Sequence, residues 1–160
     1  MTPQEAANSL LSYAWESGSF PVDPVHIAKY LGIGVVTMQL PNNVSGALIK
    51  EQDSDPIIVL SQSDSINRWR FSCAHELGHY VDRTVHNGDH YRYVDLRSDL
   101  SSLGTKDEEI FANQFAANLL MPEEDVRKAH QSMPVFLLAQ HFGVSDDAMN
   151  FRLKTLGLRK

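Results

Sequence analysis

The sequence contains one cysteine and no long apolar run. Cys73 has no partner for an intramolecular disulfide, and its place on the apolar side of a predicted helix indicates a buried thiol, not a nucleophile. No segment approaches the roughly 18 apolar residues of a membrane-spanning helix. The start, MTPQEAANSLLSYAWESG, lacks the basic residues and the continuous apolar region of a signal peptide. We therefore expect a cytoplasmic protein that does not bind membranes.

The sequence also has little positive charge. Lysine and arginine number 14, aspartate and glutamate number 20, and the formal net charge is −6. A protein that binds nucleic acid independently of sequence needs a cationic face for the phosphates, so this class is disfavoured. Of the 160 residues, 42% are apolar, which is enough for a core. The length predicts one domain.

Hydrophobic spacing and turn residues predict helices near both ends of the chain and a small sheet between them. This order indicates the α+β class. Residues 83–105 show little periodicity and are predicted to form a long loop. The predicted helices cover residues 3–16, 24–32, 66–82, 106–120 and 123–130, with two more after 133 that are separated at 143–145; the predicted strands cover 33–40, 47–49 and 57–60.

The segment FSCAHELGHYVD, residues 71–82, places two histidines and a glutamate in a predicted helix. His75 and His79 are four residues apart, so they share one face and both can direct a ring nitrogen at one ion. Glu76 lies about 100° around the helix, where it can reach water on that ion and act as a general base. This H-E-x-x-H spacing is typical of zinc metalloproteases. Gly78 is expected to leave the adjacent face open. The alternative is a partly solvated helix edge without metal.

A catalytic zinc site requires a third protein ligand and an open position. The helix predicted over 106–120 begins with Asp107, Glu108 and Glu109. Glu109 lies on the flank of the apolar face, three residues before Ala112, which favours it as the ligand; Glu108 remains an alternative. The small side chain of Ala112 should let this helix approach the histidine-bearing helix. Without a metal, the three acidic residues would be explained by their favourable interaction with the helix dipole. Zinc is the default ion, although manganese, iron and cobalt are also accepted.

Two segments, RFSCAHELGHY and EIFANQFAANLLMP, resemble the ImmA/IrrE family of metallopeptidases. The resemblance continues in LAQHFGVSDDAMNFRLKTLGL and so covers most of the chain. It implies a zincin-like, gluzincin-type core with zinc on His75, His79 and Glu109, and with Glu76 as base. It also implies cleavage of a protein partner, typically a transcriptional repressor or regulator encoded nearby in a phage, mobile element or toxin–antitoxin locus. Members often carry a further histidine where this chain has Asp82.

The hydrolysis of an amide usually needs a further donor to the oxyanion. The predicted loop supplies several side chains that could donate to the oxyanion or contact substrate, and their spacing does not distinguish them. The predicted hairpin could also accept an extended peptide as an added strand. The candidates in the loop are Tyr91, Tyr93, His86 and His90.

We predict a single metallopeptidase domain over 1–160, with a catalytic core at about 1–125 and a helical end at 126–160. This end has the helix, glycine turn and helix of a helix-turn-helix, so a second hypothesis is that the chain is a DNA-binding module. Asp146 and Asp147 begin its second helix, where they would meet phosphates unfavourably. A third hypothesis is that the protein is catalytically inactive, retains the metal site and sequesters a regulator.

Overall fold

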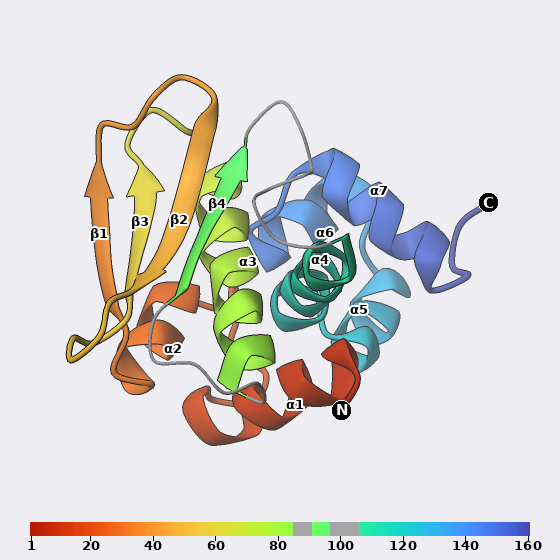
Figure 1. Ribbon diagram of the computed structural model, residues 1–160. Helices are drawn as coiled ribbons and strands as arrows, with labels where there is room; N and C mark the ends of the chain where they lie inside the picture. The colour runs from red at the N-terminus through yellow and green to blue at the C-terminus, as the bar shows by residue number, and fades with distance from the viewer. Residues whose placement is uncertain (85–90, 97–105) are drawn as a thin grey trace.

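The computed structural model describes residues 1–84, 91–96 and 106–160. Within these ranges the chain forms seven helices and one four-stranded sheet, which confirms the α+β class (Figure 1). None of the described helices is both long enough and apolar enough to cross a membrane. The helices are α1 (Pro3–Ala14), α2 (Pro24–Tyr30), α3 (Ile66–Thr84), α4 (Lys106–Leu120), α5 (Glu123–His130), α6 (Val135–Phe142) and α7 (Asp146–Thr155); the strands are β1 (Gly34–Met38), β2 (Val44–Lys50), β3 (Ile57–Ser61) and β4 (Tyr91–Leu96).

The sheet has the strand order β1-β3-β2-β4. Strands β2 and β3 are antiparallel, with Ala47 opposite Val59, so the predicted hairpin is confirmed. Strand β1 runs parallel to β3, and β4 runs antiparallel to β2. Among the described strands, the two edges of the sheet are therefore β1 and β4.

The prediction of a continuous loop over 83–105 is wrong, because Tyr91–Leu96 forms strand β4. This strand pairs with β2, and Tyr93 lies opposite the fully buried Leu48. Charged residues interrupt the short segment, so its local sequence carries a weak strand signal. Its pairing with residues more than 40 positions away decides its conformation, as is common for strands.

Helix α3 lies between the sheet and α4 (Figure 1). Its start is capped by Ser65, whose hydroxyl accepts a hydrogen bond from the backbone N–H of Arg68 at 3.3 Å. The eight consecutive residues Ser72–His79 are all buried, since the sheet covers one side of the helix and α4 covers another. The polar residues of the H-E-x-x-H motif therefore lie in the interior of the protein.

Helices α3 and α4 approach each other closely at Gly78. A Cβ atom at Gly78 would lie 2.8 Å from the Cα of Ala112 and 3.2 Å from the Cβ of Phe115. The close approach predicted at Ala112 is thus confirmed. The interpretation of Gly78 as an open face beside the site is wrong, because α4 fills the space next to it.

We expect Gly78→Ala to lower the free energy of unfolding by about 1–3 kcal/mol, because the added methyl overlaps the backbone of α4. This net loss already includes the gain of about 1 kcal/mol that alanine brings to a helix interior. Thermal unfolding should show a midpoint lowered by roughly 2–12 °C. Gly34→Ala is the matched control, since a Cβ there would meet Ile57 Cγ1 at an ordinary 3.6 Å. An unchanged midpoint for Gly78→Ala would contradict the close packing.

Two arginines join the C-terminal helices to the rest of the chain. Arg70 of α3 donates to the carbonyl of Gly143, in the turn between α6 and α7, at 3.0 Å. Arg152 of α7 donates to the carbonyl of Met121, just after α4, at 3.0 Å. Gly143 adopts a φ of 67°, and the Ser145 side chain caps α7. The guanidinium groups of Arg70 and Arg152 therefore serve contacts within the chain.

Candidate metal centre

Three buried side chains from two helices converge in the interior. His75 and His79 belong to α3, and Glu109 belongs to the first turn of α4. The Nε2 atoms of the two histidines are 3.1 Å apart. Glu109 places Oε2 at 3.2 Å from His75 Nε2 and Oε1 at 3.0 Å from His79 Nε2. The structure thus brings together the three side chains that the sequence predicts as ligands.

The hydrogen bond of His75 indicates that the cluster can bind a cation. Its Nδ1 lies 2.9 Å from Oδ1 of Asn113. Because an amide oxygen only accepts, Nδ1 carries the hydrogen, and in the neutral imidazole Nε2 then presents a lone pair to His79 and Glu109. A hydrogen on Nε2 of His79 could form a hydrogen bond in only one of the contacts among the three side chains. A cation between His75, His79 and Glu109 would attract all of their ligand atoms. Buried polar atoms of this kind need such compensation.

The spacing of these atoms also fits a divalent metal. Nitrogen and oxygen ligands lie about 2.0–2.1 Å from zinc, so ligands at tetrahedral angles are about 3.3 Å from each other. The distances of 3.0–3.2 Å in the cluster are close to this value. Two histidines and one glutamate form a known ligand set of catalytic zinc sites, in which the fourth position stays open.

The two competing carboxylates of α4 make different contacts. Glu109 is 6% exposed and belongs to the cluster. Glu108 lies about 100° further around the helix, and its Oε1 accepts a hydrogen bond from the hydroxyl of Tyr93 at 3.2 Å. Asp107 is exposed. Among the described residues, Glu109 is therefore the carboxylate that is placed to share an ion with the histidines.

Two of the four side chains predicted as oxyanion or substrate contacts lie in β4. The ring of Tyr93 stacks on that of His79, with centroids 4.1 Å apart and planes 10° apart. Burial, together with the Glu108 carboxylate, raises the pKa of the Tyr93 phenol to about 12, so its hydroxyl stays a donor at neutral pH. Tyr91 packs under the guanidinium of Arg83 at 5.6 Å. His86 and His90 lie outside the described residues.

Two further polar residues belong to the helices that carry the cluster, Glu76 in α3 and Asn113 in α4. Glu76 follows His75 in α3 and is fully buried. Asn113 is a site residue that the sequence reading missed. It follows Glu109 by four residues and so lies on the same face of α4, which is the signal that could have found it.

The buried thiol predicted at position 73 also lies in this part of α3. Cys73 is fully buried, and burial raises the pKa of its thiol. Since the thiolate is the reactive form, we expect the native protein to show almost no reaction with a thiol reagent at neutral pH. One thiol per chain should react in denaturant. Rapid, stoichiometric labelling of the native protein would contradict the buried position.

Comparisons with known proteins identify a family and a similar fold. A peptidase family model, described as the IrrE N-terminal-like domain, matches residues 28–154, a range that includes the whole cluster. Among solved structures, the chain is similar to a Mycobacterium tuberculosis transcriptional regulator, with a TM-score of 0.65 over 95% of this chain and 18% identity. At that identity the likeness shows the fold alone, and this chain spans 46% of that structure's length. No curated protein matches the chain significantly.

Proposed function

This chain belongs to the peptidase family of the IrrE N-terminal-like domain, and from that premise we propose that it is a metal-dependent endopeptidase that cleaves a protein partner. The observation that carries the proposal is the buried convergence of His75, His79 and Glu109, with Glu76 next to them in α3. We further propose that α3 and α4 form a zincin-like core of the gluzincin type. Residues 1–160 would then act as one metallopeptidase domain, with 126–160 as its helical end.

The proposed roles follow from the chemistry of each side chain. His75, His79 and Glu109 hold a divalent cation, by default zinc, with manganese, iron or cobalt as possible replacements. A cation at this position lowers the pKa of water and polarises a peptide carbonyl. Glu76 removes a proton from the attacking water and delivers it to the leaving amine. Asn113 fixes the ring of His75 so that Nε2 is directed at the cluster.

We propose a transcriptional regulator encoded nearby as the substrate. The resemblance of RFSCAHELGHY and EIFANQFAANLLMP to the ImmA/IrrE family supports this class of partner. Both strands of the predicted hairpin are paired on their outer sides, β3 with β1 and β2 with β4, so the hairpin itself cannot accept a peptide. Among the described strands, β4 is the edge that carries Tyr93 next to His79 and offers a means of binding. An extended segment of the partner could pair with this edge, so that its backbone runs beside the metal cluster.

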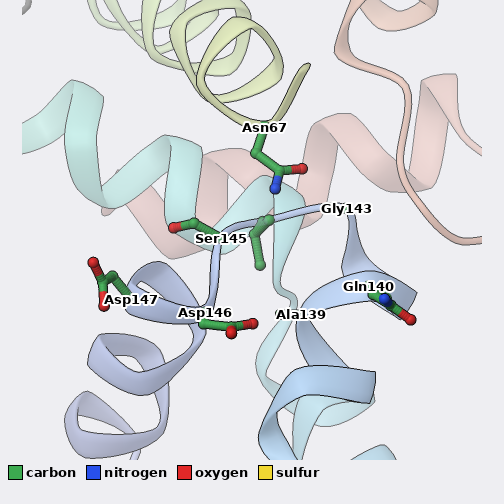
Figure 2. Close-up of a pocket in the computed structure, with 8 residues that line it drawn as sticks. Asn67, Ala139, Gln140, Gly143, Ser145, Asp146 and Asp147 are labelled. Carbon is green, nitrogen blue, oxygen red and sulfur yellow. The ribbon is translucent and has the colours of Figure 1, made fainter. Parts of the chain in front are cut away.

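The alternative of DNA binding meets unfavourable charges. A hollow of about 580 Å³ lies between Asn67, near the start of α3, and the turn that joins α6 to α7. Figure 2 shows Asp146 and Asp147 on the first turn of α7 beside this hollow. Carboxylates at the N-terminal end of α7, the second helix of the possible helix-turn-helix, would repel DNA phosphates. The guanidinium of Arg152 in the same helix is bonded to the Met121 carbonyl instead.

Metal analysis and a cleavage assay test the proposal. The purified protein should contain one metal ion per chain. When it is incubated with the product of the neighbouring regulator gene, intact-mass spectrometry should show two fragments whose masses sum to the substrate plus one water. A chelator should prevent cleavage, and added zinc should restore it. A protein with bound metal and an intact regulator would overturn the choice of substrate, whereas a protein that binds no metal would overturn the metallopeptidase itself.

A further inference from the structure

The two histidines of the cluster are oriented by different contacts. His75 has the hydrogen bond from Nδ1 to Asn113 described above. The Nδ1 atom of His79 is buried, and no described residue forms a hydrogen bond with it. A histidine that binds metal is usually oriented by a hydrogen bond at its second nitrogen. Among the described residues, the contact that restrains the His79 ring is of another kind.

The flat contact with Tyr93 supplies this restraint. The rotation of an imidazole about its χ2 bond is otherwise broad and roughly two-fold. With the ring centroids 4.1 Å apart and the planes 10° apart, a turn of the His79 ring would drive its edge into the phenol ring. The stacking thus holds the plane of the His79 ring. Within that plane, the contact of Nε2 with Glu109 at 3.0 Å selects between the two ring orientations that are related by half a turn.

Tyr93 is in turn fixed from two sides. Its backbone is held in β4 opposite Leu48 of β2, and its side chain is 6% exposed. Its hydroxyl donates to Oε1 of Glu108 at 3.2 Å. Glu108 directly precedes Glu109 in α4. One side chain therefore links the sheet, the ring of His79 and the helical turn that carries Glu109.

We propose that Tyr93 is a positioning residue of the metal centre, which orients His79 by stacking and is anchored to α4 through Glu108. This role differs from the contact with substrate or oxyanion that the sequence suggested for Tyr93. The inference rests on the proposed function only in taking His75, His79 and Glu109 as a metal site. It does not require that the partner be known.

The affinity for zinc, measured by competition with a chelator, tests this role. Tyr93→Leu removes the aromatic ring, and we expect zinc to bind about 10-fold more weakly, the lower range for outer-sphere partners of metal ligands. Tyr93→Phe keeps the stacking and loses the bond to Glu108, so its loss should be smaller than about 10-fold. Tyr91→Leu is the matched control on the same strand, with a ring centroid 6.1 Å from that of Tyr93. Its zinc affinity should stay within about twofold of the original.

A second measurement separates positioning from general stability. The cobalt-loaded Tyr93→Leu protein should show a changed visible absorption spectrum, since the spectrum reports on the ligands around the ion. A Tyr93→Leu protein that folds and binds zinc as tightly as the original would overturn the inference alone. If Tyr93→Leu does not fold, the zinc affinity and the cobalt spectrum of Tyr93→Met, which also lacks a ring, decide instead, and values unchanged from the original would overturn the inference. Failure of the original protein to bind zinc would overturn the proposed function as well.

Discussion

Replacing Glu76 with glutamine is expected to abolish cleavage while the metal content stays at one ion per chain. Glutamine has nearly the same volume as glutamate, so it fits the fully buried position. It cannot accept a proton from water as a carboxylate does. Since general acid–base catalysis contributes about 10²–10⁴-fold, the cleavage rate should fall by at least about 100-fold. The rate is measured by mass spectrometry of the regulator, and the metal by elemental analysis.

Glu124→Gln, an exposed change of the same kind on α5, is the matched control and should keep the original rate. A Glu76→Gln protein that cleaves at the original rate would show that another group is the base. If the original protein binds the regulator and holds metal but never cleaves it, the reading as an inactive, sequestering protein would be correct instead.

Replacing Glu109 with glutamine should weaken zinc binding by at least about 100-fold, because the loss of a direct ligand should cost more than the 10–100-fold typical of outer-sphere partners. Glu108→Gln is the internal control. Its carbonyl oxygen can still accept the hydrogen bond from Tyr93, so we expect its affinity to stay within about threefold of the original. Chelator competition measures both.

The relative size of the two losses in zinc affinity shows which carboxylate is the third ligand. A larger loss for Glu108→Gln would assign the third ligand to Glu108 and contradict the geometry of the cluster. Equal, small losses of zinc affinity would show that neither carboxylate binds the ion. Their negative charges would then stabilise the N-terminal end of α4 through the helix dipole.

The sequence predicted well what depends on local periodicity. The helix that bears the histidines and the helix that begins with the acidic residues were both located, since each combines apolar spacing with a clear start. The H-E-x-x-H spacing itself placed His75 and His79 on one face. Apolar flanking residues favoured Glu109 over Glu108, which agrees with the contacts in the structure.

The sequence did not predict what depends on contacts between distant segments. Strand β4 forms by pairing with β2, and no local pattern indicated that Tyr93 would reach His79. From the sequence alone, the side of α3 that carries Gly78 is interpreted as open, whereas in the structure α4 packs against it. Asn113 was missed because it matters only once α4 has docked on α3.

The docking of α4 on α3 has a consequence for the amount of protein in the cell. The proposed ligands come from both helices, so the unfolded chain lacks a preformed site and the ion binds the folded state preferentially. At a free ion concentration 100 times the Kd, this preference adds about 2.7 kcal/mol to the folded state. Starvation for the ion would enlarge the unfolded fraction that proteases degrade. The supply of the ion would then set the abundance of the protein as well as its proposed activity.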